Sequence, residues 1–404
     1  MIDVLGTALE RFIGGDPCRA HRHPGGQADL TDEQDRSVVA WTPSRYLTEQ
    51  LASRGYIHTR RFIAFPSQSR ARWLLPQGNC NGTLSGLEIY TPYAPAARVL
   101  KAVLRLALKM GWPDWAGQRV LVASRDSLPL EVLVAEITGE RHPIFALSLG
   151  TPTRFRKLTI QVMVPNGEIL GYIKLPLTEA AGERVRHEAQ MLGRLSDCAA
   201  LRARIPRVLH AGEWENGYIL FQSSAPVSPG PIEFNELYGD FLRVLWNIHP
   251  TEKPGNVLLK EVACLWQAAE PQLNSRWRAL GEASLTLAKR ELIGIMIPCG
   301  VSHGDFAPWN ARVANGQLSV FDWESASWDA PAAWDIYHFK TQVAALGNKK
   351  NSLPEFRNRS SGERASFLLY LLNSVRQLID EETPSRGVGL ECRRRLIEKQ
   401  LEEC

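Results

Sequence analysis

The sequence predicts an α+β protein in which an antiparallel sheet precedes a largely helical region, with an additional N-terminal α/β module in front of both. Three observations support this prediction. Short alternating apolar segments follow one another from residue 143, a serine- and proline-rich break occupies residues 223–231, and long helical patterns dominate beyond that break. A chain of 404 residues is long enough for two or three domains.

Composition narrows the class of protein. Hydrophobic residues make up 44% and charged residues 22%, which is ordinary globular usage, and the net charge of +4 is too small to favour nucleic acid or an anionic membrane as a partner. The first residues lack the pattern of a signal peptide, and charged residues interrupt the longest apolar runs. The seven cysteines contain no CxxC pair. We therefore expect a cytoplasmic protein that has no disulfide framework and binds neither nucleic acid nor a membrane.

We expect residues 1–140 to form a separately packed module whose role the sequence does not specify. Two strand-like segments, at 61–65 and 119–123, and one amphipathic helix at 94–110 stand out in this stretch. None of them carries a pattern with a recognisable chemistry.

The next region, residues 141–226, carries the predicted sheet. Strands are expected at 144–149, 157–164 and 168–175, then a helix at 179–195, then strands at 207–211 and 218–222. Asn166-Gly167 joins the second and third strands. This dipeptide predicts a type I′ hairpin, because both of its residues tolerate a positive φ.

The remainder, residues 227–404, is predicted to be mainly helical. Long helices are expected at 234–249, 262–293 and 367–380. One interruption separates the last two helices, and it includes the sequence VSHGDFAPWNARVANGQLSVFDWE at residues 301–324.

This interruption holds the strongest chemical signal in the chain. Asp305 and Asn310 are five positions apart, and Asp322 follows twelve positions later, after a short hairpin. With His303 in front, this spacing is typical of phosphoryl-transfer sites. A carboxylate such as Asp305 accepts the proton of a hydroxyl nucleophile, and oxygen ligands such as Asn310 and Asp322 suit Mg²⁺ bound to a triphosphate.

A site of this kind also needs a lysine that holds the nucleotide phosphates and an acidic residue that fixes the lysine. Lys174 lies on the third predicted strand, and the following helix offers Glu188 or Glu183. Glu188 shares a helical face with apolar residues. Glu183 lies in the first turn, where a carboxylate favours the helix dipole, so we favour Glu188 as the partner of Lys174.

Two further nucleotide contacts are expected from position in the chain. The connection between the first two strands is where a phosphate-binding loop is expected, and there Gly150 and Thr151 are the candidate residues. Gly150 is the single glycine of this loop, so the match to a glycine-rich loop is weak. After the strand at 218–222, Gln222 and Ser223 occupy the position where backbone groups would pair with the adenine edge.

The stretches HGDFAPWN and VFDWESASWDAPAAWDIYHF resemble the aminoglycoside phosphotransferase and choline kinase superfamily, whose members show HGDxxxxN, then a strand ending in DWE, then a further aspartate. The resemblance covers about residues 143–340. It implies a bilobal protein-kinase-like fold, with an antiparallel-sheet N-lobe at 141–226 and a helical C-lobe at 227–404. It also implies ATP or GTP with Mg²⁺ as cofactors, and transfer of the γ-phosphate to a hydroxyl of a small molecule.

The same resemblance implies a role for each motif residue. Asp305 would be the catalytic base and His303 would orient its loop. Asn310 and Asp322 would be the metal ligands, and Asp335 would be a buried structural aspartate.

Two functions are consistent with these residues. The first is a small-molecule kinase acting on an aminoglycoside, a choline-like compound, a sugar or a related metabolite. The second is a catalytically weak nucleotide-binding scaffold that recruits a partner through residues 1–140. The complete set of motif residues favours the kinase, and the glycine-poor loop favours the scaffold. A protein kinase is disfavoured because the DFG position has the sequence Asp-Trp-Glu and no APE segment follows. The sequence specifies neither the acceptor nor the oligomeric state.

Overall fold

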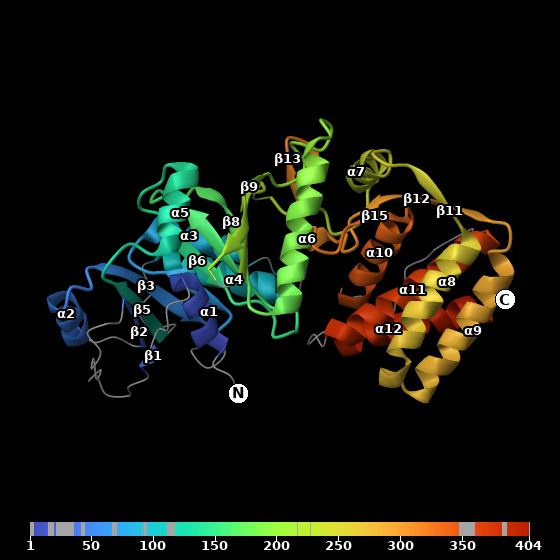
Figure 1. Cartoon of the computed structure of the whole chain (residues 1–404), viewed down its shortest axis with the longest axis horizontal. Coiled ribbons are helices and arrows are strands. Elements are labelled where there is room, and N and C mark those ends of the chain that lie inside the picture. The colour runs from blue at the N-terminus through green and yellow to red at the C-terminus, as the bar shows by residue number, and fades with distance from the viewer. Residues whose placement is uncertain are drawn as a thin grey trace. The chain divides into compact units, whose positions relative to one another are not determined.

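The computed structural model describes residues 4–14, 20–21, 36–41, 45–66, 71–90, 92, 95–110, 118–215, 217–226, 228–346, 360–381 and 386–403. The chain divides into two compact units (Figure 1). Unit 1 comprises Met1–Ala189 with Arg207–Ser224, and unit 2 comprises Gln190–Pro206 with Ala225–Cys404.

Unit 1 is built on one extended sheet, named here the long sheet. In the described part of the chain its strand order is β1-β2-β5-β3-β4-β6-β7-β8-β10-β9, and all neighbours are antiparallel except β1 and β2. The strands are β1 (Ala20–His21), β2 (Ser37–Trp41), β3 (His58–Phe65), β4 (Trp73–Pro76), β5 (Gln118–Ser124), β6 (Ile144–Ser148), β7 (Lys157–Met163), β8 (Ile169–Pro176), β9 (Val208–Trp214) and β10 (Gly217–Ser223). The helices are α1 (Val4–Ile13), α2 (Arg45–Ser53), α3 (Cys80–Gly86), α4 (Pro95–Lys109), α5 (Pro129–Thr138) and, as far as Ala189, α6 (Glu179–Ser196), with a 3-10 turn η2 (Leu87–Ile89).

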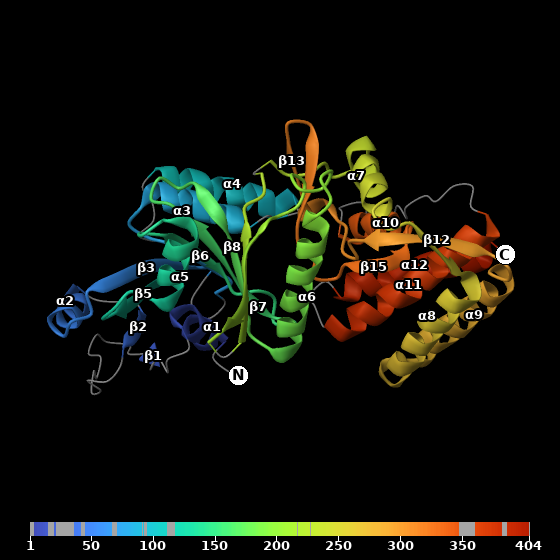
Figure 2. The same ribbon diagram turned by 45° about the horizontal axis from the view of Figure 1, so that its top comes forward.

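Strand alternation decides which helix covers which face of the long sheet. Phe145 and Leu147 on β6 pack in one core with residues of α1 and α5, whereas Ala146 between them packs with residues near α3 and α4. Successive side chains of a strand point to opposite faces. α1 and α5 therefore cover one face, and α3 and α4, which lie side by side in Figure 2, cover the other.

The separate packing expected for residues 1–140 is wrong. β4 pairs with β6, with Trp73 opposite Ser148 and Leu74 opposite Leu147, so the sheet continues across position 140 without a break. One core also joins both parts: Phe12 contacts Phe145 with ring centroids 5.4 Å apart. The reason is that an edge strand leaves its N–H and C=O groups unpaired, and β4 satisfies those of β6.

The hairpin at Asn166-Gly167 forms, but its turn is not type I′. Gly167 has φ +92, whereas Asn166 does not have a positive φ. The N–H of Gly167 donates to the carbonyl of Val164 at 2.9 Å, so Pro165 occupies the first central position of the turn. Proline fixes φ near −65°, which excludes the type I′ conformation at that position.

Unit 2 is mainly helical. Its helices are α7 (Glu236–Trp246), α8 (Gly255–Ala269), α9 (Ser275–Glu291), α10 (Trp334–Leu346), α11 (Ser361–Glu381) and α12 (Arg386–Glu402), with 3-10 turns η3 (Glu270–Gln272) and η4 (Pro308–Asn310). The strands β11 (Thr251–Pro254), β12 (Met296–Ser302) and β15 (Ser327–Pro331) form a small antiparallel sheet, and β13 (Ala311–Ala314) pairs with β14 (Gln317–Val320).

The single helix expected at 262–293 is two helices. α8 ends where η3 carries a proline, and Asn274 caps α9 by accepting a hydrogen bond from the N–H of Trp277 at 3.1 Å. Proline and an N-capping asparagine together stop one helix and start the next. The predicted α+β architecture, a sheet followed by a helical region, is otherwise confirmed. Of the helices described, none is both long enough and apolar enough to cross a membrane.

Candidate active site

The β13–β14 hairpin explains the spacing of the motif in unit 2. Asn315 and Gly316 both have positive φ, 50° and 72°, which is the backbone requirement of a tight type I′ turn. The hairpin pairs Ala311 with Val320, and just outside it the N–H of Phe321 donates to the carbonyl of Asn310 at 3.0 Å. Asn310 and Asp322, twelve positions apart in sequence, therefore leave the hairpin at the same end.

The loop after β12 is held by Asp335 on the first turn of α10. The carboxylate of Asp335 accepts the backbone N–H of His303 at 2.8 Å and of Gly304 at 3.0 Å, and it is 1% exposed. Gly304 has φ +78, and a Cβ there would lie 2.1 Å from the carbonyl oxygen of Ser325. The loop thus requires glycine at 304, and Asp335 is a buried structural aspartate, as expected.

His303 is fully buried, and its hydrogen bonds define its tautomer. Its Nδ1 accepts the N–H of Asp305 at 3.2 Å, and its Nε2 lies 3.0 Å from the carbonyl oxygen of Phe321. A nitrogen that accepts carries no proton, so Nε2 carries it and donates. The ring lies 4.6 Å from that of Trp323, which is buried beneath the loop. His303 thus connects the Asp305 loop to the backbone beside Asp322.

The side chain of Asp305 is held at both oxygens. Asn310 Nδ2 donates to Oδ2 of Asp305 at 2.9 Å and to its carbonyl oxygen at 2.9 Å. His338 Nε2 lies 2.9 Å from Oδ1, within hydrogen-bond distance. The side chain of Asp305 is nevertheless 36% exposed, so it remains accessible to a reacting group.

His338 is a residue that the sequence reasoning missed. It lies three positions after Asp335 on α10. Residues three apart share one face of a helix. The spacing was the signal available in the sequence: because Asp335 holds the loop, the side chain at position 338 is expected to face the same loop.

Asp322 follows β14 with φ +71 and is partly buried. A positive φ is unfavourable for a residue with a Cβ, and such residues cluster at functional sites. This conformation fits the metal-binding role predicted for Asp322, which stays a prediction.

In unit 1, Lys174 and Glu188 form a buried ion pair. Lys174 Nζ lies 2.6 Å from each carboxylate oxygen of Glu188, and the two residues are 5% and 0% exposed. Lys174 alternates on β8 with Ile173 and Leu175, which face the α1 and α5 side, so its side chain faces the side on which α6 packs. Glu183 is exposed, and the pairing is the one favoured from the sequence.

The loop between β6 and β7 is held by hydrogen bonds among its own residues. Gly150 has φ +64, and a Cβ there would lie 2.6 Å from the carbonyl oxygen of Lys157, so glycine is required. The carbonyl of Thr151 accepts the N–H of Thr153 at 2.8 Å, and Arg156 Nε donates to the carbonyl of Leu149 at 2.7 Å. Burial and the neighbouring Arg72 lower the pKa of Arg156. The guanidinium groups of Arg72 and Arg156 therefore lie close enough to repel one another.

At the end of β10, Gln222 and Ser223 differ in their partners. Ser223 uses its N–H to donate to the carbonyl of Arg207 at 2.8 Å, and its Oγ accepts the N–H of Arg207 at 3.0 Å. The amide oxygen of the buried Gln222 has no hydrogen-bond partner among the described residues. Gln222 thus retains an unsatisfied acceptor, whereas the Ser223 N–H is already used.

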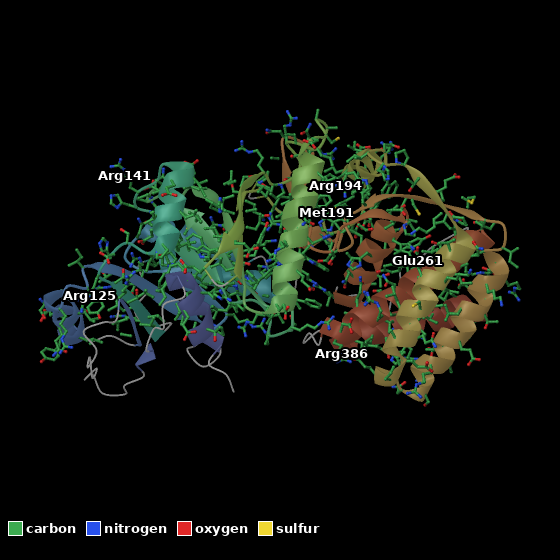
Figure 3. The ribbon with its side chains drawn as sticks, viewed as in Figure 1. Arg125, Arg141, Met191, Arg194, Glu261 and Arg386 are labelled. Atoms are coloured by element: carbon green, nitrogen blue, oxygen red, sulfur yellow. The ribbon has the colours of Figure 1, made fainter. Side chains whose placement is uncertain are left out.

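A cavity of about 240 Å³ lies within unit 2 beside the Asp305 loop. Gly304, Asp335 and His338 line it on one side, and Glu261 on α8, labelled in Figure 3, lines it elsewhere. Leu265, which is 42% exposed, also borders it, so the cavity reaches solvent.

Comparison with known proteins gives a family match over residues 172–339. A search of curated protein sequences gives no match. Among solved structures, the GDP complex of aminoglycoside 2'-phosphotransferase-IIIa is 15% identical, with a TM-score of 0.44 over 68% of this chain and 98% of that one. Aminoglycoside phosphotransferase APH(4)-Ia is 14% identical, with a TM-score of 0.47 over 68% and 97%. A choline/ethanolamine kinase family protein from Mesorhizobium loti is 15% identical, with a TM-score of 0.41 over 68% and 94%.

The structure has the antiparallel sheet followed by a helical region that the motifs implied. Lys174, Glu188 and the motif from His303 to Asp335 all lie within residues 172–339, and over these residues the chain matches the phosphotransferase enzyme family.

Proposed function

We propose that this chain transfers the γ-phosphate of ATP or GTP to a hydroxyl group of a small molecule. The observation that carries the proposal is the geometry around Asp305. Its carboxylate is partly exposed, both oxygens are fixed, and its loop is locked by Asp335. A base that is oriented before the substrate arrives needs little reorganisation during the reaction.

Each residue has a distinct task in this proposal. Asp305 accepts the proton of the acceptor hydroxyl as that oxygen attacks the γ-phosphorus, and Lys174, fixed by Glu188, holds nucleotide phosphates. The backbone amides around Gly150 and Thr151 bind phosphate oxygens, and the segment at Gln222 and Ser223 binds the base. Because Ser223 N–H is engaged, Gln222 is the better candidate for a contact with the base.

The residues proposed as metal ligands fit Mg²⁺. Asn310 donates to Asp305 through Nδ2, which leaves its amide oxygen as the atom for a cation, and Asp322 supplies a carboxylate. Hard oxygen ligands of this kind suit Mg²⁺. When bound, the ion would neutralise charge on the phosphates.

The first test is nucleotide binding. We expect ATP or GTP with Mg²⁺ to raise the melting temperature, and EDTA to abolish the shift. A screen of hydroxylated metabolites, sugars and aminoglycosides, measured as release of the nucleoside diphosphate, then identifies the acceptor. Binding without turnover for any acceptor would favour the nucleotide-binding scaffold instead, and the absence of any thermal shift would contradict both functions.

A further inference from the structure

We propose that His338 is a positioning residue for the catalytic base, and that it fixes the Asp305 carboxylate through its Nε2–H. This inference rests on the proposed function. His338 Nε2 lies 2.9 Å from Asp305 Oδ1, and the imidazole side chain is only 8% exposed. A carboxylate can only accept at neutral pH, so the proton lies on Nε2.

The other side of the imidazole is held by α11. The hydroxyl of Tyr370 lies 3.3 Å from His338 Nδ1. Burial raises the pKa of the Tyr370 phenol, which therefore keeps its proton and can donate it to Nδ1. The Nδ1 atom then accepts, and this fixes the same tautomer that the carboxylate requires.

Buried polar contacts continue from Tyr370 to Ser374 on α11 and to Arg393 on α12. The Tyr370 hydroxyl also bonds to Ser374, one turn later on α11, and Arg393 Nε of α12 donates to Ser374 Oγ at 2.5 Å. Arg393 is 1% exposed. A continuous set of buried polar contacts therefore links α12 and α11 to the base. Buried hydrogen bonds of this kind restrict the arrangement of the side chains that make them.

The Gln342 carboxamide is a further polar neighbour of the ring. Its Nε2 atom is placed 3.2 Å from His338 Nε2. Two donors cannot share a hydrogen bond, so we assign the amide oxygen to that side. The amide oxygen of Gln342 then accepts from the same Nε2–H that donates to Asp305, so the two hydrogen bonds are compatible.

The first experiment compares variants under single-turnover conditions. His338→Ala should lower the rate of phosphoryl transfer by about 10-fold to 100-fold, because a base that loses its orientation is less effective. Nucleotide affinity should stay unchanged. His338→Gln, whose amide N–H can replace Nε2–H, should recover most of the rate. His249→Ala is the control, because that ring lies against Trp328 and is not part of the site.

Chemical rescue separates positioning from a merely structural role. His338 lines the cavity of about 240 Å³ beside the loop, so its removal leaves an opening that solutes can enter. Imidazole should restore His338→Ala in a saturable manner, whereas N-methylimidazole, which has no N–H, should not. An unchanged rate in His338→Ala, or equal rates for the Ala and Gln variants without rescue, would overturn the inference.

A spectroscopic readout makes the inference independent of any acceptor. The ring signals of His338 are identified as those that are lost in His338→Gln. Their nitrogen-15 chemical shifts report which ring nitrogen carries the proton. We expect protonated Nε2 in the wild-type protein and a mixture of tautomers in Tyr370→Phe. A wild-type ring protonated at Nδ1 alone overturns the inference even if turnover is found. If turnover is never found but Nε2 is protonated, the proposed function fails while the contact stands.

Discussion

Asp305 is fixed on two sides, by an amide from η4 and by an imidazole from α10. The two contacts hold different oxygens of the carboxylate, so its orientation is set before a substrate arrives. A proton acceptor that is already oriented needs little reorganisation during the reaction.

Replacement of Asp305 by Asn should separate binding from turnover. The carboxamide keeps the shape of the side chain but cannot accept the hydroxyl proton, so turnover should fall by about 10²-fold or more, a barrier increase of roughly 2.7 kcal/mol. Nucleotide affinity should change little. The exposed Asp240→Asn on α7 is the control. An undiminished rate in the Asp305 variant would remove Asp305 from the proposed mechanism.

The Lys174–Glu188 pair should behave as a buried ion pair in stability measurements. Glu188→Ala removes the buried carboxylate that contacts the Lys174 ammonium through both oxygens, and should lower the free energy of unfolding by about 3 to 5 kcal/mol. Lys174→Met combined with Glu188→Leu should cost less than Glu188→Ala alone. Chemical denaturation checks both.

The exposed pair Arg186–Glu213 is the matched comparison, with side chains 45% and 73% exposed. Glu213→Ala should change the free energy of unfolding by less than about 1 kcal/mol. Equal losses for Glu188→Ala and Glu213→Ala would contradict the burial of the first pair.

At the scale of single elements, the loop between β12 and η4 depends on residues that come later in the chain. Asp335 of α10 holds its first half, and Ser325 packs against Gly304. The loop is therefore formed only when α10 is in place.

Gly304→Ala should be strongly destabilising, because a Cβ at 304 is unfavourable at φ +78 and also collides with the Ser325 carbonyl. We expect a loss of more than about 3 kcal/mol, beyond the 1–3 kcal/mol of backbone strain alone. Gly316→Ala is the matched control, since it has φ +72 but no heavy atom within 4 Å of the added Cβ. Similar losses of melting temperature for the two variants would contradict the collision.

The sequence allowed good prediction of elements with strong local patterns. The strands from 144 to 176 alternate clearly, and the motif residues follow a fixed spacing, so β6, β7, β8 and the Asp305 loop were expected close to where they lie. α12 was missed because its charged residues resemble a solvated stretch, although Arg393 is buried. His338 was missed because its role depends on contacts with Asp305 and Tyr370, which are distant in sequence.

At the scale of the whole chain, pairing between distant strands was the part that local patterns could not supply. Trp73 on β4 and Ser148 on β6 are 75 positions apart, and no local pattern in either strand indicates that it pairs with the other. The alternation of a strand shows which face is apolar, but not its neighbour in the sheet. The separate module expected for residues 1–140 failed for this reason.

A chain shortened to begin at Gly139 should therefore fold poorly. It would expose the edge of β6 and the part of the core that α1 and α5 cover. We expect aggregation or loss of a cooperative melting transition, because an exposed apolar edge strand pairs with other chains. A monomeric, cooperatively melting product that binds nucleotide as the full chain does would contradict this. A chain shortened only to begin at Val4 is the control.

The pairing of β4 with β6 also has a consequence for local opening. Amides in the middle of a continuous sheet exchange with solvent only when a large cooperative part of the structure opens. The N–H groups of Leu74 and Leu147, both fully buried on neighbouring strands, should exchange as slowly as those of Ile160 and Ile173 deeper in the long sheet. Residues before position 140 and the strand that carries Lys174 would then open as one unit, and a substitution in β4 would change the lifetime of the closed state at β8.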